Sequence, residues 1–341
     1  MTKKQPSARF DSINFSIIIP NYNGSAFIPD CLNSLVKSIE HCPQSKFELI
    51  FVDNGSKDDS IELAKNLTKN FPILNTKYLI LNTNHGFASA VNRGINKSKY
   101  SWVVVLNNDL TMEPNWFELI STTIQKNQDP KITTYFGTVL TKDGTKFESQ
   151  GLDFKIQGKC LNISNGLSFS KSTIYHLPST KLVWGASASL IVYKKEIIKK
   201  IGLFDADFFA YEEDVDLSFR LNKLGYKTLY IPQAISYHLG GGTSNRMGNF
   251  RNRMDAKNWI FLIIKNYSAT EFWSNFISIF DQRLRNLSGL IKNTVIKYRF
   301  LSIFYLPYDI VKTYGEVVIK LPKMLQKRHQ IKKLLQSTKS N

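Results

Sequence analysis

Short apolar runs alternate with amphipathic stretches along the first third of the chain. Each run is rich in β-branched residues and stops at a polar residue, as strands buried on both faces of a sheet do. The runs are 15–20, 47–52, 78–81 and 102–106. Between them, apolar residues recur at helical spacing, for example in 26–40, which predicts helices. This alternation predicts an α/β fold with a mostly parallel central sheet.

Polar side chains follow three of these predicted strands, at the point where each strand leaves the core. They are Asn21 and Asn23, Asp53, and Asp109. Ligands of open α/β sheets bind outside the carboxyl ends of the strands, so we expect these side chains to line one pocket. Asp109 offers hard oxygen ligands to Mg²⁺ or Mn²⁺. Alternatively, Asn107–Asp109 turns the chain and caps a helix that starts near Glu113.

The ends of the predicted strands 47–52 and 78–81 allow contacts to a nucleotide. Asp53 can accept hydrogen bonds from a base N–H or a ribose hydroxyl, or it can be a turn residue. Asn84, Gly86 and Asn92 lie where a loop opens into a helix; a helix N-terminus offers N–H groups to a pyrophosphate, and glycine permits close approach. Neither a Gly-x-Gly-x-x-Gly motif nor a Walker lysine loop follows these strands, so those two phosphate-binding schemes are not supported.

Beyond residue 112 the pattern loosens. Short β-prone pieces between 135 and 175 predict hairpins over the rim of the pocket. Trp184 precedes the small residues Gly185 and Ala186. It can be a stacking platform for a substrate that lies against the backbone, or it can belong to the core.

Four carboxylates fall within five residues at the start of a predicted helix: Glu212, Glu213, Asp214 and Asp216. The helix dipole accommodates one or two acids there. Four repel one another and raise the pKa of the least solvated carboxyl, which then suits a general base. His238 lies at a strand end before a glycine-rich loop, which makes it a candidate metal or phosphate contact.

The composition is that of a globular protein, with 341 residues of which 43% are hydrophobic and 21% charged. This length predicts one large domain with an appendage, or two domains. The three cysteines have no metal-ligand spacing and cannot all pair, which favours a reducing, cytoplasmic setting. The N-terminal residues contain no apolar h-region, so we expect no signal peptide.

Positive charge is concentrated near the C-terminus. Residues 246–341 hold 18 of the 45 Lys and Arg and 5 of the 27 Asp and Glu, a net charge of +13 out of +18. Aromatic and basic residues mix in 298–311 and 317–335, without the ~18 consecutive apolar residues of a spanning helix. This pattern predicts helices that lie in an anionic membrane interface. The alternative is a solvated helical bundle or a subunit interface.

Six segments together resemble the family 2 glycosyltransferases of the GT-A (nucleotide-diphospho-sugar transferase) fold, which are inverting enzymes. The segments are Ser16–Gly24, Val52–Ser56, Asn84–Asn92, Leu106–Asp109, Trp184–Ala186 and Tyr211–Asp216. Their order and spacing are similar to those of bacterial rhamnosyl- and galactofuranosyl-transferase-like enzymes of surface polysaccharide synthesis. The resemblance implies a catalytic domain over 15–245, between a disordered lead-in (1–14) and a basic helical region (246–341).

The resemblance also implies roles for the matched residues. Asp214 would be the catalytic base, and Asp109 and His238 would hold Mg²⁺ or Mn²⁺. The acceptor would contact Trp184, Gly185, Ala186 and Glu213. The donor would be bound by Pro20, Asn21, Asn23, Asp53, Asn84, Gly86, Asn92, Asn107 and Asn108. The chain departs from the family's D-x-D motif because Asn107 replaces its first Asp, which leaves Asp109 as the only acid there and increases the dependence on His238.

The implied reaction moves a sugar, rhamnose or another hexose, from a UDP- or dTDP-sugar to a saccharide or lipid-linked acceptor on the inner face of the cell membrane. A retaining mechanism would need a second carboxylate as nucleophile, and none is evident. Two alternatives are a catalytically inactive sugar-nucleotide-binding module and a basic nucleic-acid-binding protein, whose binding would be salt-sensitive. The second leaves the acidic cluster unexplained, so we expect no nucleic acid. The oligomeric state is open.

Overall fold

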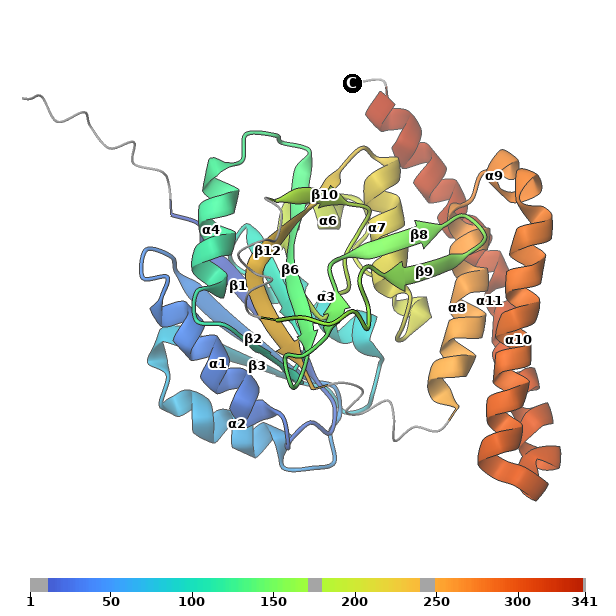
Figure 1. The fold of residues 1–341 in the computed structure, drawn as a ribbon, viewed down its shortest axis with the longest axis horizontal. Coiled ribbons are helices and arrows are strands. Elements are labelled where there is room, and N and C mark those ends of the chain that lie inside the picture. Colours follow the sequence, from blue (N-terminus) through green and yellow to red (C-terminus); the bar gives the residue numbers. More distant parts are fainter. Residues whose placement is uncertain (1–11, 171–179, 240–248, 340–341) are drawn as a thin grey trace, which may run out of the picture.

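The structure is a computed structural model that describes residues 12–170, 180–239 and 249–339. In these residues the centre is a ten-stranded sheet in the order β10-β12-β6-β11-β4-β1-β2-β3, with β5 beside β12 and β7 beside β6 (Figure 1). The strands of this sheet are β1 (Phe15–Asn21), β2 (Phe47–Asp53), β3 (Thr76–Ile80), β4 (Trp102–Leu106), β5 (Leu110–Met112), β6 (Ile132–Thr141), β7 (Phe147–Ser149), β10 (Lys181–Val183), β11 (Leu190–Lys194) and β12 (Lys227–His238). A separate hairpin consists of β8 (Leu152–Lys155) and β9 (Lys159–Asn162).

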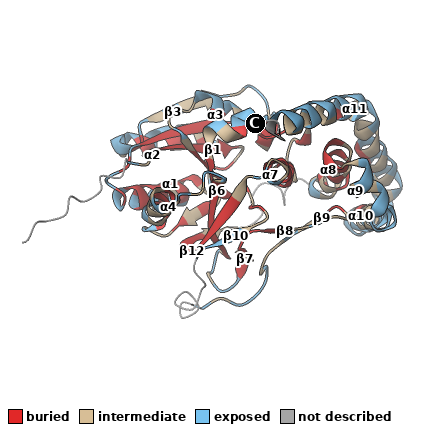
Figure 2. Ribbon diagram, turned by 90° about the horizontal axis from the view of Figure 1, so that it is seen from above, coloured by how far each residue is buried: buried red, intermediate tan, exposed pale blue. Residues whose placement is uncertain are grey.

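Helices cover both faces of the sheet and continue beyond it toward the C-terminus. They are α1 (Ile28–Glu40), α2 (Ser60–Lys69), α3 (Phe87–Lys97), α4 (Trp116–Lys126), α6 (Lys195–Lys200), α7 (Glu213–Lys223), α8 (Phe250–Asn266), α9 (Ala269–Ser274), α10 (Phe276–Tyr298) and α11 (Ser302–Lys339). The strand order reverses direction after β3, so right-handed crossovers put α1 and α2 on one face and α3 on the other. Figure 2 shows the buried strands between these layers.

The predicted α/β fold with a mostly parallel sheet is confirmed. Strands β3, β2, β1 and β4 pair in parallel, whereas β11 runs antiparallel between β4 and β6. The four strands predicted in the first third of the chain occur within two residues of their expected bounds. Most of the predicted lead-in 1–14 lies outside the described residues.

The prediction of hairpins in 135–175 is confirmed in part, because β6 pairs with β7 and β8 pairs with β9 in antiparallel hairpins. What the prediction misses is the wider role of β6. β6 is a strand of the central sheet between β11 and β12, and residues 171–179 lie outside the described part. The partners of β6 are far away in sequence, so a local pattern does not reveal it. Gly137 allows a close approach to β12, because a Cβ there would lie 2.0 Å from the Ala234 carbonyl oxygen, next to the bulge of that strand.

Asn107–Asp109 do not cap a helix near Glu113, one of the two alternatives drawn from the sequence. A short strand, β5, follows them and pairs with the end of β12. Helix α4 begins only at Trp116, after Asn115. The polar segment therefore joins two strands, and its side chains stay at the carboxyl edge of the sheet.

The C-terminal helices pack beside the sheet around a second hydrophobic cluster. Trp259 and Phe261 of α8, Val215 and Phe219 of α7, and Met324 of α11 are among its buried members. Helix α8 therefore lies between α7 and the α10–α11 hairpin (Figure 1). Within the described ranges, no helix combines the length and the apolarity that crossing a membrane requires.

Candidate active site

A cavity of about 740 Å³ opens at the carboxyl edge of the sheet, a size suited to a small-molecule ligand. Ten of the residues predicted from the sequence line it: Pro20, Asn21, Asn84, Gly86, Asn107, Asn108, Asp109, Glu213, Asp214 and His238. They come from the ends of β1, β4 and β12 and from the starts of α3 and α7. The residues predicted at the strand ends therefore meet in one cavity, although they are far apart in the chain.

The side chain of Asp53 lies one layer beneath the cavity and does not line it. It is 2% exposed and accepts hydrogen bonds from Asn21 Nδ2 (3.0 Å) and the Ser56 amide (3.0 Å). Asn21 Oδ1 in turn accepts from Asn108 Nδ2 (2.6 Å). Asp53 thus orients Asn21, which does line the cavity. Asn23, at φ +51°, accepts from the Lys57 amide and also lies outside the lining.

Asn54, which the sequence interpretation missed, lines the cavity at the end of β2. Its Oδ1 accepts from the His85 amide (3.0 Å), and its Nδ2 donates to Asn84 Oδ1 (2.9 Å). Asn84 Oδ1 also accepts from the Gly86 amide (2.9 Å). These bonds fix the loop that precedes α3. The sequence does contain a signal for Asn54, because it directly follows Asp53 at the polar end of the same strand.

Gly86 ends that loop in a conformation suited to glycine, with φ +85°. A Cβ at Gly86 would lie 2.4 Å from the Phe209 carbonyl oxygen. Helix α3 begins at the next residue, Phe87, which lines the cavity, so the positive end of the helix dipole faces it. The amide of Ala88 donates to the Phe209 carbonyl (3.4 Å). Asn92, further along α3, instead clips the chain at Phe204, donating to its carbonyl (2.7 Å) and accepting from its amide (3.1 Å).

Asp109 and His238 meet at the ends of β4 and β12. His238 Nε2 lies 3.3 Å from Asp109 Oδ1, and His238 Nδ1 lies 2.5 Å from Glu148 Oε1. Burial alone lowers the pKa of His238, but the bonds to the two carboxylates outweigh it and raise that pKa to about 10. Glu148 carried no signal in the sequence, because the pairing of β7 with β6 places it here.

This pair fits a divalent cation that displaces the Nε2 proton of His238 and completes its coordination with a ligand. Among the described side chains, no group of three His, Cys, Asp or Glu is disposed to hold a metal ion. Mg²⁺, however, usually takes only one or two protein carboxylates together with phosphate oxygens and water. Cis ligands bound at roughly 2.1 Å are about 3 Å apart, close to the Asp109–His238 separation. Glu148 on the other ring nitrogen matches the carboxylate partner typical of metal-binding histidines, and the buried Asn107 Oδ1 has no hydrogen-bond partner in the described structure.

The backbone that leads into α7 is strained. Phe209, Tyr211 and Glu212 all have left-handed φ angles, between +64° and +68°, each of which costs on the order of 1–3 kcal/mol. Asn258 of α8 holds this loop, because its Nδ2 lies 2.7–3.0 Å from the carbonyl oxygens of Phe208, Ala210 and Tyr211. Backbone strain stabilised by its surroundings is typical of functional sites.

Asp214 and Glu213, in the first turn of α7, both line the cavity; Glu213 is buried and Asp214 is half-buried. Asp214 Oδ2 accepts from the Ala188 amide (3.0 Å) and Oδ1 from the Val215 amide (2.8 Å). Burial raises the pKa of Asp214, although these N–H groups favour its ionised form. Burial and the charge of Asp214 raise the pKa of Glu213 well above its usual value. The site thus places a carboxylate that can accept a proton beside a carboxyl that can donate a hydrogen bond.

The other two acids of the cluster have different surroundings. The expectation that all four repel one another is wrong for Asp216, which is fully buried and paired with Arg220 (2.8 Å) and Lys265 (2.8 Å). These cations lower the pKa of Asp216 despite its burial. Glu212 lines the cavity beside Asp255 of α8, and burial followed by the Asp255 charge raises the pKa of Glu212 well above its usual value.

Trp184, Gly185 and Ala186, the predicted acceptor contacts, are not among the residues that line the cavity. The Trp184 ring stacks on Phe154, with centroids 4.6 Å apart. Of the two alternatives for Trp184, the structure therefore favours packing in the core. A Cβ at Gly185 would lie 2.6 Å from Ser218 of α7, which explains the small residue there. The next segment, Ser187–Ser189, lines the cavity instead.

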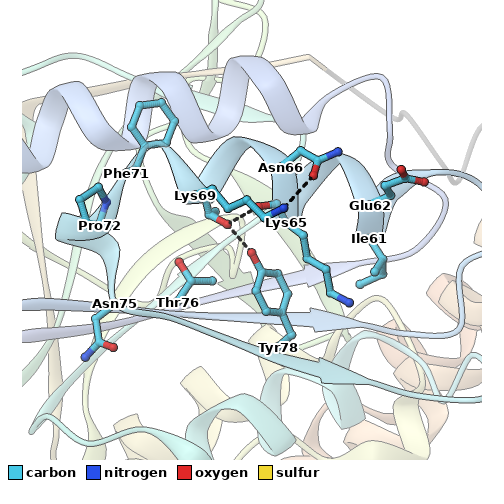
Figure 3. Close-up of a pocket in the computed structure, with 11 residues that line it drawn as sticks. Ile61, Glu62, Lys65, Asn66, Lys69, Phe71, Pro72, Asn75, Thr76 and Tyr78 are labelled. Atoms are coloured by element: carbon cyan, nitrogen blue, oxygen red, sulfur yellow. Dashed lines mark hydrogen bonds between the residues drawn. The ribbon is translucent and has the colours of Figure 1, made fainter.

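A second depression of about 630 Å³ lies at the free edge of the sheet, between α2 and β3 (Figure 3). Four of its polar residues form two pairs: Lys69 Nζ approaches Asn66 Oδ1 at 3.5 Å, and the hydroxyls of Thr68 and Tyr78 are bonded. Among its lining residues, Glu62 is the one carboxylate. The first cavity, in contrast, is lined by the carboxyl groups of Asp109, Glu148, Glu212, Glu213 and Asp214.

Comparison with known proteins agrees with this arrangement. A model of the family described as "Glycosyl transferase family 2" matches residues 16–202. A poly-β-1,6-N-acetyl-D-glucosamine synthase of Staphylococcus epidermidis is 24% identical over 309 residues, which cover 85% of this chain and 69% of the relative. The corresponding synthase of Staphylococcus aureus strain COL is 24% identical over 240 residues, 69% of this chain and about half (52%) of the relative.

Two solved structures share the fold. GalNAc-T7 with UDP, GalNAc and Mn²⁺ superposes with a TM-score of 0.60 at 15% identity, covering 88% of this chain and 58% of its own. The mannosyltransferase PcManGT of Pyrobaculum calidifontis, in complex with GDP-Man and Mn²⁺, gives a TM-score of 0.52 at 12% identity, covering 92% and 85%. The GT-A fold expected from the sequence is thereby confirmed.

Proposed function

The chain belongs to glycosyl transferase family 2, and we propose that it transfers a hexosyl group from a nucleoside diphosphate sugar to a hydroxyl of a saccharide or lipid-linked acceptor. The observation that carries this proposal is that Asp214 shares one cavity with the Asp109–His238 pair. The segment Ser187–Ser189 connects them. Ala188 donates its amide to Asp214 Oδ2 (3.0 Å), and the Ser189 carbonyl accepts from the Asn107 amide (2.8 Å).

Asp214 is the general base of the proposed reaction. Its carboxylate removes the proton of the acceptor hydroxyl while that oxygen attacks the anomeric carbon of the donor. Burial raises the pKa of Asp214 toward the range useful for a base at neutral pH. The two backbone N–H bonds leave the carboxylate in a fixed position. Glu213 and Glu212 are placed to hold other hydroxyls of the acceptor.

The donor lies along the ends of β1 and β2 and the start of α3. Asn21 and Asn54 line this part of the cavity, and their side-chain N–H groups hold the surrounding loops in place around the base and ribose. The N-terminus of α3 after Gly86 faces the diphosphate. The UDP, GalNAc and GDP-Man in the two neighbouring structures support a nucleoside diphosphate sugar as donor. The names of the staphylococcal relatives add N-acetylglucosamine to the candidate sugars, beside rhamnose and other hexoses.

Asp109 and His238 are the proposed ligands of a divalent cation, Mg²⁺ or Mn²⁺. Such an ion supplies positive charge to the departing diphosphate, and Mn²⁺ in the two neighbouring structures supports it. Glu148 holds the His238 ring by its other nitrogen, and Asn107 takes the position in which a second acid would bind. Asp109 is therefore the one acid among the proposed ligands, and the affinity for the cation should depend strongly on His238.

The proposed stereochemistry is inversion in one displacement. A retaining double displacement needs a carboxylate nucleophile. Glu213 is poorly suited to this role because its raised pKa favours the neutral carboxylic acid. In the proposed division of the chain, residues 15–245 form the catalytic domain, and residues 246–341 form a helical region that supports the Asp214 loop through Asn258.

A donor panel tests this function. UDP-, dTDP- and GDP-sugars, with UDP-N-acetylglucosamine and dTDP-rhamnose among them, are incubated with the full chain and Mn²⁺, Mg²⁺ or EDTA, and nucleoside diphosphate release is measured. The proposal expects cation-dependent release from one donor class. Binding of a sugar nucleotide without release under any condition would instead indicate an inactive binding module, and the absence of both would refute the proposal.

A further inference from the structure

The tip of the α10–α11 hairpin, residues 292–312, lies at one end of the molecule (Figure 1). Large apolar side chains are exposed there. The exposed members are Val295, Ile296, Phe300, Leu301, Ile303, Phe304, Tyr305, Tyr308 and Val311. Phe300 is 95% and Phe304 74% exposed, although both are large enough to gain substantially from burial. Soluble monomers rarely expose contiguous apolar patches of this kind, which mark interaction surfaces.

The exposed charged side chains of the tip are all positive. Lys292, Lys297, Arg299 and Lys312 are exposed. Asp309 is the one acid in this segment of the sequence, and it is buried beneath the tip, 5% exposed. A second copy of the tip would bring these cations together, and they would repel one another. An anionic lipid surface complements both the cations and the apolar side chains.

Buried hydrogen bonds attach the tip to the rim of the cavity. Asp309 accepts from Asn249 Nδ2 (3.0 Å), which also contacts Thr294 of α10. The residues after Asn249 are Phe250 and Arg251, and both line the cavity. The tip and the cavity rim are therefore held together at the first turn of α8.

We propose that this tip inserts into the boundary between headgroups and acyl chains of an anionic phospholipid bilayer, with Phe300 and Phe304 as the principal anchors. The attachment through Asp309 then keeps the cavity close to the membrane surface. This placement suits an acceptor whose sugar is linked to a lipid, and that part of the inference rests on the proposed function. The membrane surface itself does not depend on it.

Vesicle co-sedimentation of the full chain tests the proposal. The vesicles contain phosphatidylcholine with phosphatidylglycerol, or phosphatidylcholine alone, and each is measured at low and high salt. We expect binding to the anionic vesicles, weakened by salt. Phe300→Ser combined with Phe304→Ser should reduce the partition coefficient on the order of 100-fold, since burial of one Phe side chain corresponds to roughly tenfold or more.

A matched control replaces two exposed leucines outside the hairpin, Leu167 (61%) and Leu182 (52%), by Ser, and its partition coefficient should equal that of the wild type. Equal binding by both double variants, or no binding of the wild type to anionic vesicles, would overturn the proposal. Light scattering without lipid supplies a further test: a wild-type dimer that the Phe300/Phe304 variant lacks would assign the tip to a second copy.

Sugar transfer to a water-soluble acceptor without vesicles separates this inference from the proposed function. The Phe300/Phe304 variant should retain the wild-type rate there. If the wild type itself shows no transfer but binds anionic vesicles, the proposed function fails and the membrane surface stands.

Discussion

Replacement of Asp216 by Asn should reduce the free energy of unfolding by about 3–5 kcal/mol, the usual cost of removing one partner from a buried ion pair. The Asp216 side chain is fully buried. It accepts from Arg220 Nε (3.0 Å) and Nη2 (2.8 Å), from Lys265 Nζ (2.8 Å) and from Asn266 Nδ2 (2.8 Å). The variant leaves the guanidinium and the ammonium 4% exposed, with less negative charge beside them.

Lys265 retains Asp205 at 2.7 Å, so the loss should fall toward the lower end of that range. The assay is urea unfolding followed by tryptophan fluorescence, with the free energy obtained by linear extrapolation. Asp281→Asn is the matched control, because Asp281 and Arg285 form the same i,i+4 pair on α10 but are 57% and 71% exposed. That variant should be indistinguishable from the wild type.

The stabilisation by Asp216 should depend on pH in a definite direction. The folded-state pKa of Asp216 is lowered from 3.8, because Arg220 and Lys265 outweigh the effect of burial. Ionised Asp216 therefore stabilises the folded state fully above pH 3.8, the pKa of an ordinary Asp. This stabilisation is lost as the pH falls through the lower pKa of Asp216 in the folded state. The difference in free energy of unfolding between the wild type and Asp216→Asn should be largest at neutral pH and should decrease below pH 3.8. A loss as small as that of Asp281→Asn at neutral pH would refute the reasoning.

Three further predictions concern the cavity and the core. Gly86→Ala should weaken nucleoside diphosphate binding by about tenfold or more in calorimetric titration, because the new Cβ meets a carbonyl oxygen; Gly166→Ala, at a similar φ with nothing within 4 Å, should leave binding unchanged. Asn258→Leu removes the bonds that hold the strained loop, so it should lower kcat far more than it raises the donor KM, and a change in KM alone would contradict that role. Burial raises the thiol pKa of Cys31 and Cys42, so both should react with a disulfide reagent only after unfolding; rapid labelling of the folded chain would be the contrary result.

The parts of the fold that the sequence predicts are those with a local pattern. β1, β2 and β4 are almost entirely buried and consist mainly of apolar residues, with Ser16 in β1 and Glu48 in β2 as the polar interruptions before the strand ends. Helix α7 carries its apolar residues at helical spacing. β6 escapes this reasoning because its buried threonines and its glycine are explained only by β11 and β12, which follow much later in the chain.

The site shows the same limit. Asn21, Asp109 and His238 follow from the rule that ligands bind at strand ends. Glu148 does not, because a hairpin brings it to His238 from outside the strand ends. Asp216 stands in the sequence among acids that face the cavity, but Lys265, which pairs with it, lies on α8. A sequence pattern locates an acid on a helix, whereas its protonation depends on partners from other elements.

The central claim is that Asp214 is the base of a glycosyl transfer, and the single-turnover transfer rate of Asp214→Asn tests it most directly. The measurement uses the donor selected by the panel, with nucleoside diphosphate affinity determined on the same protein. We predict a rate lower by about 10²–10⁴-fold with the affinity within a few-fold of the wild type, since the proposed base acts on the acceptor hydroxyl and not on the nucleotide. We also predict that the wild-type rate falls in acid at a pH above 3.8, because burial raises the pKa of Asp214. A variant that transfers sugar at close to the wild-type rate would contradict the account.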